Sequence, residues 1–238
     1  MNISQIPTAS FSLGRFLFTI NPQTLITSAI TCLFLILLGI FLGRGLSKFP
    51  NRKQCVAELI IKSFQEIIKD ELGKDWAKFF PLITTLFLFI LLSNWIGIIP
   101  GLKPPTADLN TCLGLGLLVF FISHISAIRE NGFRNYIKKY FSPFFFLFPI
   151  NLISELGKVV SHSFRLFGNM FGGAIIFAVV GPIVFEISKA IGMPLAISSP
   201  LLIFIFLILQ VFFGLFIGTV QAFVFSILAL TYIGFARE

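Results

Sequence analysis

The stretch Glu155-Leu-Gly-Lys-Val-Val-Ser-His-Ser-Phe-Arg-Leu-Phe-Gly-Asn169 decides the fold, because it carries ionisable side chains into the middle of an apolar run. That run lasts from Phe141 to about Ile187. At 1.5 Å per residue, a helix of this length far exceeds one upright crossing of ~30 Å of hydrocarbon. The run must therefore be a hairpin, a broken helix, or a strongly tilted helix whose start lies on the membrane surface.

The rest of the chain is similarly apolar. Of its 238 residues, 56% are hydrophobic and only 12% are charged, whereas about 25% of the residues in an average soluble domain are charged. A helical crossing takes about 20 apolar residues, and four further stretches meet that requirement: 24–42, 79–99, 109–128 and 200–235. We predict an all-α integral membrane protein, a single polytopic domain over residues 1–238 with about five membrane-embedded helices.

The connection after the first crossing predicts a different kind of helix, over residues 51–74. Its apolar residues recur at helical spacing with Lys and Glu between them, which is typical of a helix lying in the membrane interface. A soluble cytoplasmic helix is the alternative. The apolar set is Val56, Leu59, Ile60, Phe64, Ile67 and Ile68.

The net charge of +8 is concentrated in two connections. Eight of the 18 Lys and Arg residues lie in 44–78 and four in 129–139. Strongly basic connections alternate with weakly basic ones, as five crossings require. The positive-inside rule then places the N-terminus outside and the C-terminus in the cytoplasm. This distribution argues against nucleic acid as a partner.

The ionisable residues of the opening stretch share one helix face. At 100° per residue, Glu155, Lys158, His162, Arg165 and Asn169 fall within an arc of about 80°. An arginine at the centre of a span costs ~2.5–3.5 kcal/mol on insertion scales and marks a functional site by default. A local ion pair explains Glu155 and Lys158 equally well. A local hydrogen bond explains His162 as well as proton transfer does.

The last apolar stretch carries a second polar face, formed by Gln210, Gly214, Gly218 and Gln221. Gly214 and Gly218 have the spacing that permits close helix approach, and Gly168 and Gly172 repeat it on the arginine helix. We predict that this face packs closely and matches the polar stripe.

Other classes of site find little support. The three cysteines form no CxxC pair or metal-spaced cluster, so we expect no metal and no cofactor. Catalytic motifs such as HExxH are missing, and His124 is better explained as a packed or hydrogen-bonded residue. A secondary transporter whose arginine binds a substrate carboxylate is the main alternative, although its usual internal repeats are not apparent.

The motif Ser163-Phe-Arg-Leu-Phe-Gly-Asn169 resembles subunit a of the F-type ATP synthase membrane sector, of bacterial or plastid type. A lysine seven residues before the arginine and a later Gln-Ala-Phe make the combination highly specific. The resemblance covers most of the chain. It also includes Asn94, Pro105-Thr-Ala-Asp-Leu-Asn110, Pro149-Ile-Asn-Leu152, Gln221-Ala-Phe-Val-Phe225 and Tyr232-Ile-Gly234.

The resemblance implies a stator with two offset half-channels beside a rotating ring of c subunits. The family's two long tilted helices would be residues 144–184 and 199–235. Arg165 takes the place of the arginine that meets the ring carboxylate, Gln221 that of the facing glutamine, and Asn169 that of the asparagine one turn beyond. Glu155 would line the cytoplasmic access path.

The resemblance also implies the setting. The partners would be the c-ring, the b subunits of the peripheral stalk, the remaining subunits and membrane lipid, in a bacterial plasma membrane. The translocated ion would be H⁺ or Na⁺. The chain itself would not be an enzyme, because ATP formation belongs to partner subunits. The remaining candidates for the ion path are Ser161, Lys158, His162, Asp108 and Gln210.

One departure concerns the outer half-channel. Many relatives have Glu nine residues after the arginine, where this chain has Ala174. Some relatives place a partner His where this chain has Gly214, and Glu186 is the only acid between Ala174 and the C-terminal residue. The outer path would then rely on Asn, Ser, Thr and water, or on Asp108. A path without a carboxylate would also suit sodium, so the ion stays open.

Overall fold

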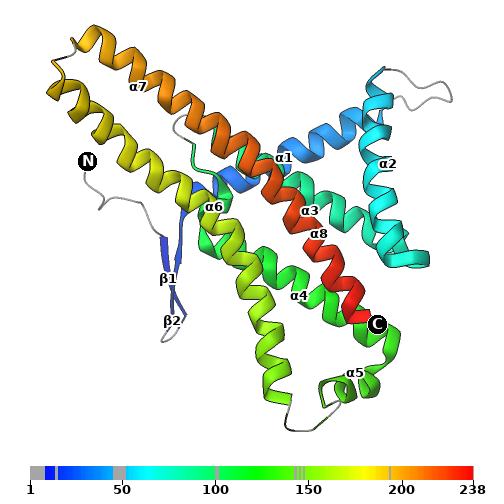
Figure 1. The fold of residues 1–238 in the computed structure, drawn as a ribbon. Coiled ribbons are helices and arrows are strands. Elements are labelled where there is room, and N and C mark those ends of the chain that lie inside the picture. Colours follow the sequence, from blue (N-terminus) through cyan, green and yellow to red (C-terminus); the bar gives the residue numbers. More distant parts are fainter. Residues whose placement is uncertain are drawn as a thin grey trace.

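The computed structural model describes residues 9–13, 16–44, 52–99, 102–141, 144, 146, 148–192 and 194–237. Residues 51, 145 and 147, which fall within predicted helices, lie outside this set. The chain begins with an antiparallel hairpin of β1 (Ala9–Leu13) and β2 (Phe16–Ile20), in which Ala9 pairs with Ile20 and Leu13 with Phe16. The described residues after it are helical apart from short turns (Figure 1).

Helices account for the body of the molecule. In chain order they are α1 (Pro22–Gly43), α2 (Arg52–Leu72), α3 (Trp76–Ile96), α4 (Leu109–Asn131), α5 (Phe133–Tyr140), α6 (Phe148–Ala190), α7 (Leu195–Gln210) and α8 (Gly218–Arg237). Single 3₁₀ turns precede α3 (Gly73–Asp75) and α4 (Pro105–Ala107). Five of the described helical segments are long and apolar enough to cross a membrane. The prediction of an all-α membrane protein is confirmed, with the short N-terminal hairpin as an addition.

Local sequence explains where several helices begin and end. Asn21 caps α1 by accepting a hydrogen bond from Gln23 N at 3.1 Å, with proline at the first helical position. Asp108 caps α4 in the same way, accepting from Asn110 N at 3.0 Å. Gly132, with φ of 76°, separates α4 from α5, because only glycine adopts this backbone conformation readily.

From Phe148 onward the long apolar run is one unbroken helix, neither a hairpin nor a broken helix. The 43 residues of α6 extend ~65 Å at 1.5 Å per residue, about twice the thickness of the hydrocarbon. It begins at Phe148 and ends at Ala190. The last apolar stretch is also helical throughout, because a π-helical segment (Val211–Ile217) joins α7 to α8. Figure 1 shows α6 and α7 side by side, with α8 crossing α3 and α4.

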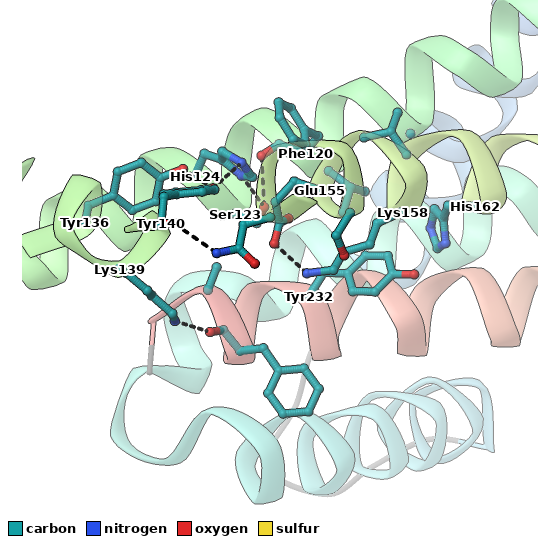
Figure 2. A pocket seen from close by; sticks show the side chains of 17 residues that line it. Phe120, Ser123, His124, Tyr136, Lys139, Tyr140, Glu155, Lys158, His162 and Tyr232 are labelled. Atoms are coloured by element: carbon teal, nitrogen blue, oxygen red, sulfur yellow. Dashed lines mark hydrogen bonds and ion pairs between the residues drawn. The ribbon is translucent and has the colours of Figure 1, made fainter. Parts of the chain in front are cut away.

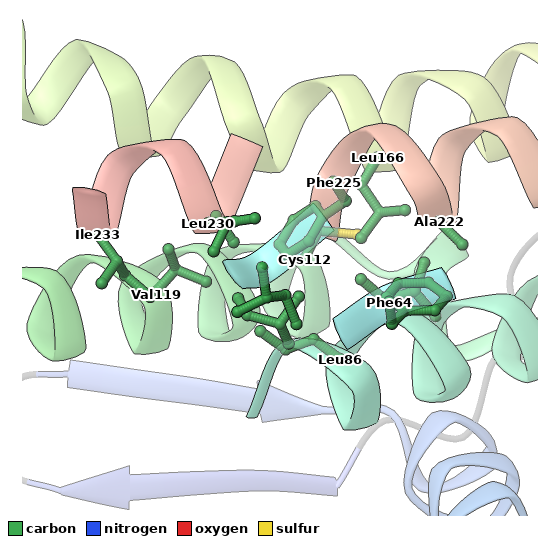
Figure 3. Close-up of a cluster of buried hydrophobic side chains, with 13 residues drawn as sticks. Phe64, Leu86, Cys112, Val119, Leu166, Ala222, Phe225, Leu230 and Ile233 are labelled. Atoms are coloured by element: carbon green, nitrogen blue, oxygen red, sulfur yellow. The ribbon is translucent and has the colours of Figure 1, made fainter. Parts of the chain in front are cut away.

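The core lies where α3, α4 and α8 meet, with α6 and α2 packed against it (Figure 3). Phe225 and Leu230 of α8 and Leu166 of α6 are fully buried there. In contrast, α1 exposes most of its apolar side chains, including Leu33 at 58%. Such exposure is what lipid contact requires, since lipid tails are as apolar as leucine.

The predicted interfacial helix corresponds to α2, which packs one side against the core. Phe64 and Ile68 are buried, whereas Leu59 and Ile60 are exposed. A glycine with φ of 57°, Gly73, then turns the chain directly into α3. The amphipathic pattern therefore marks a helix that is half attached to the bundle.

Basic segments far apart in the sequence meet at one end of the molecule. The Arg237 guanidinium of α8 pairs with Glu130 of α4 and with Asp75, which precedes α3. Asn131 Nδ2 donates to Arg237 O at 3.0 Å, and Lys139 Nζ donates to Phe235 O at 3.0 Å. These bonds satisfy carbonyls that the end of a helix leaves without partners. The end of the first basic connection, at Asp75, and the second connection, from Glu130 to Lys139, thus meet the C-terminal end of α8.

Candidate functional site

Arg165 lies on an exposed face of α6. It forms no hydrogen bond or ion pair with any residue that the structure describes. Ser161 and Gly168 are exposed beside it, and a Cβ added at Gly168 or Gly172 would meet nothing within 4 Å. Spacings of three and four residues align these positions. We call Ser161, Arg165, Gly168 and Gly172 the open face of α6.

His162, which lies one turn before Arg165, points away from the open face of α6. Only 2% of it is exposed, and its ring centre lies 3.8 Å from that of Phe225, with the two rings tilted by 39°, and 5.5 Å from that of Tyr232. Its Nε2 has no hydrogen-bond partner among the described residues. The predicted stripe therefore divides, with His162 facing α8 and Arg165 facing outward.

Asn169 and Gln221 meet across α6 and α8. Asn169 Nδ2 donates to Gln221 Oε1 at 2.5 Å, and Gln221 is 4% exposed. The other amide atom of Gln221, Nε2, is buried without a partner in the described part of the chain. Gln221 of α8 therefore faces α6, as the resemblance implies, and it is bonded to Asn169, one turn beyond Arg165.

Glu155 and Lys158 form the local ion pair that the sequence left as one explanation. Lys158 Nζ lies 2.6 Å from Glu155 Oε1 and 5.9 Å from the centre of the Tyr232 ring. Both side chains are partly exposed. The pair is therefore accessible and held against α8.

The second polar face is not a single face in the structure. Gln210 Nε2 donates to the carbonyls of Gly97 and Ile98, at 2.9 and 3.0 Å. A Cβ on Gly214 would lie 2.6 Å from Ile98 Cγ1, and one on Gly218 would lie 2.9 Å from Asn94 Cβ. These three residues pack on the end of α3 and the turn after it, whereas Gln221 is hydrogen-bonded to Asn169 of α6. The π-helical segment between Gln210 and Gly218 changes the angular spacing that a regular helix would give.

The glycine pair of α6 also differs from expectation. Gly168 and Gly172 leave open space, whereas a Cβ added at Gly173 would lie 3.4 Å from the ring of Phe213. Close approach to α4 occurs instead at Gly116, whose added Cβ would lie 2.2 Å from Ser163 Oγ. Glycine spacing alone did not reveal which neighbour each pair would meet.

Asn94 organises a buried polar group at the other end of α8. Its Nδ2 donates to Gly218 O at 2.9 Å, and its Oδ1 accepts from Thr106 Oγ1 at 2.6 Å. Cys112 Sγ lies 3.2 Å from Thr106 O. Asp108, a candidate for the outer path, lies beside this group as the cap of α4.

Three residues bear on the outer half-channel: Ala174, Glu186 and Gly214. Ala174 and Glu186 are exposed on α6. Gly214 has no room for a side chain because Ile98 occupies the adjacent space. A histidine could not be accommodated at 214 without movement of the Ile98 side chain.

A cavity of about 390 Å³ opens between α4, α5, α6 and the end of α8 (Figure 2). Glu155, Lys158 and His162 line one wall. The other wall consists of residues that the sequence did not single out as a site: Ser123, His124, Tyr136, Tyr140, Asn151 and Tyr232. The four-residue spacing of the two α5 tyrosines was the available signal, but their proximity to His124 depends on the turn after α4.

Together these features define a class of protein: a polytopic helical membrane protein with an exposed arginine on a long apolar helix, an amide pair one turn beyond it, and a cavity lined by polar residues of the same helix.

Comparison with known proteins identifies the family. The family model described as ATP synthase A chain matches residues 25–234. ATP synthase subunit a of Moorella thermoacetica is 38% identical over 202 residues, which cover 84% of each chain. That of Acidothermus cellulolyticus is 33% identical over 221 residues, which cover 90% of this chain and 76% of the relative. ATP synthase subunit a 2 of Syntrophotalea carbinolica is 35% identical, over 85% of this chain and 83% of its own. The chain belongs to the ATP synthase subunit a family, which decides against the secondary transporter.

Proposed function

We propose that this chain is the ion-translocating stator subunit of an F-type ATP synthase, and that Arg165 meets the carboxylate of each passing c subunit. The observation that carries the proposal is the open face of α6. A guanidinium on an apolar helix is costly unless a partner or water compensates it. Arg165 has no such partner among the described residues of its own chain, and small residues beside it leave room for another helix.

Electrostatics supports this role. At ~5 Å and an effective dielectric constant of ~20, a fixed positive charge stabilises a carboxylate by about 3 kcal/mol, or roughly two pKa units. A ring carboxylate beside Arg165 would therefore release its ion. Because a guanidinium does not lose its own proton in proteins, Arg165 would also block leakage between the two half-channels.

The other candidates take supporting roles. The amide pair of Asn169 and Gln221 would hold α6 and α8 in register beside the arginine. Ser161, Lys158, Glu155 and His162 would serve the cytoplasmic access path, and Asp108 the outer one. Gln210, which bonds to carbonyls of the α3 end, would act by fixing α7 rather than by touching the ion.

The setting follows from the same assignment. The partners would be the c-ring, the peripheral-stalk b subunits and the rest of the synthase, in a bacterial plasma membrane. The N-terminus would lie outside and the C-terminus in the cytoplasm, and α6 would be strongly tilted. The ion would be H⁺ or Na⁺. The chain would not itself catalyse ATP formation.

The test replaces Arg165 in the assembled synthase. We expect Arg165→Ala to abolish ion-driven ATP synthesis in inverted vesicles while the chain still co-purifies with the c-ring. Arg165→Lys should retain charge but lose the planar fork, and should therefore restore synthesis at most in part. The control is Arg129→Ala, in the basic connection. Normal synthesis by Arg165→Ala would rule out the assignment, and comparing proton with sodium gradients would identify the ion.

A further inference from the structure

The cavity beside α6 runs from the protein surface to His162, one turn before Arg165. Lys139 and Phe235, both exposed, line one end, and the buried residues His162 and Gly116 line the other. Glu155 and Lys158 lie between these ends (Figure 2). A polar cavity of this size has room for several water molecules.

Its second wall carries a continuous row of hydrogen bonds. The Tyr136 and Tyr140 hydroxyls lie 2.7 Å apart, and the Tyr140 hydroxyl lies 3.3 Å from His124 Nε2. His124 Nδ1 lies 3.1 Å from Ser123 Oγ. Figure 2 shows Tyr136, Tyr140 and His124 next to one another, to the left of Glu155. We call Tyr136, Tyr140 and His124 the tyrosine–histidine row.

The row is held in place from three sides. Asn151 Nδ2 of α6 donates to Tyr140 O at 2.9 Å, and Lys139 of α5 donates to Phe235 O of α8 at 3.0 Å. The His124 ring lies 3.9 Å from that of Phe120 on its own helix. These bonds fix an eight-residue helix, α5, across the end of the cavity.

We propose that the tyrosine–histidine row carries protons between the cytoplasmic surface and the cavity, with His124 as the group that exchanges a proton with the cavity. The proposal rests on the stator function and deepens it by naming the ion as a proton at this step. In the direction of ATP synthesis, His124 takes up a proton from water in the cavity. It passes one to Tyr140, Tyr140 passes its own to Tyr136, and Tyr136 releases one to the cytoplasmic surface. Each group then regains its initial protonation.

The chemistry of the three groups suits transfer rather than storage. A hydroxyl both donates and accepts, and a neutral imidazole has one nitrogen of each kind. Burial raises the pKa of Tyr140 and of Tyr136 above the usual value, so both stay neutral hydroxyls. The charged groups that face His124 are Glu155 and Lys158 of α6, and their ion pair leaves no net charge beside it. A sodium ion cannot move along such a row.

The experiment measures passive proton flux through the membrane sector, in vesicles from which the catalytic sector has been removed. We expect Tyr140→Phe and His124→Gln each to lower the flux about tenfold. This is less than the ~10²–10⁴-fold that proton-transfer groups contribute, because water in the cavity offers a parallel route. Phe133→Leu, an exposed aromatic change on the same short helix, is the matched control and should leave the flux unchanged.

Chemical rescue separates proton transfer from packing. Imidazole added to His124→Ala should restore the flux, whereas pyrazole, which has the same shape but is a much weaker base, should not. Equal rescue by both compounds, or wild-type flux in Tyr140→Phe and His124→Gln, would overturn the row while leaving the stator assignment intact. No proton flux in wild-type vesicles would overturn the row, and normal ATP synthesis by Arg165→Ala would overturn the stator assignment.

Discussion

The two halves of α6 pack in different ways. In residues 155–169, the arginine half, polar side chains meet α8 through the Asn169–Gln221 bond and the His162–Phe225 contact. In residues 170–190, the phenylalanine half, glycines receive aromatic rings from the other long helix. A Cβ added at Gly181 would lie 3.0 Å from Phe206 Cζ, and the Phe206 ring stacks with that of Phe177 at 5.7 Å between centres.

The arginine half forms polar contacts with α8, whereas the phenylalanine half forms packing contacts with α7, and the two kinds of contact do different things. Polar contacts in the arginine half fix the direction of each group around Arg165, because hydrogen bonds are directional. In the phenylalanine half, aromatic rings of α7 pack over glycines of α6. Small residues in membrane helices generally allow such close approach, and no polar contact is needed for it. Helix α6 therefore joins a segment that orients polar groups to a segment that only packs against α7.

The largest effect is expected from breaking the contact between Gly116 of α4 and Ser163 in the arginine half of α6. Gly116→Val should lower the stability of the chain by about 1–3 kcal/mol, as overpacking typically does, because the first added carbon would already lie 2.2 Å from Ser163 Oγ. Thermal unfolding in detergent and yield of assembled complex measure this. Gly114→Val on the same helix, where an added Cβ meets nothing within 4 Å, is the control. Equal stability of the two variants would mean that the close contact between Gly116 and Ser163 does not contribute to the stability of the chain.

A smaller effect tests whether the halves differ in kind. Double-mutant cycles across Asn169–Gln221 and across Phe177–Phe206, using leucine replacements, should each give a coupling energy of about 0.5–1.5 kcal/mol. Only the amide pair should also reduce ATP synthesis at equal assembly, because it lies beside Arg165. Loss of synthesis of similar size in both cycles would mean that the phenylalanine half takes part in translocation.

The smallest effect compares neighbouring glycines at the boundary of the halves. Gly172→Ala and Gly173→Ala should each change the unfolding free energy of the isolated chain by no more than about 1 kcal/mol, since alanine favours helix and neither site is crowded. In the assembled synthase, only Gly172→Ala should slow ATP-driven pumping, because that position belongs to the open face of α6. Slowing by Gly173→Ala alone would place the partner on the other side.

The sequence predicted the membrane class and the five apolar helices, which the structure confirms, whereas the site around Arg165 stays a prediction. It also predicted that Gln221 faces the arginine helix, through the resemblance rather than through periodicity. It missed the cavity wall, because His124, Tyr140 and Asn151 lie on three helices and share no spacing. Periodicity also misplaced Gln210, Gly214 and Gly218, because the π-helical segment alters the angle between successive residues.

What the sequence determined by itself depends on composition and local repeat. A run of apolar residues must form a helix in lipid, since backbone polar groups find no other partners there, and most basic residues fall in the connections between the apolar runs. What only the tertiary structure decided is which neighbour each face meets. Lipid and apolar side chains are equally good surroundings for an apolar helix, so hydrophobicity selects no partner. Close fit and hydrogen bonds between helices do, and these turned His162 inward and left Arg165 exposed.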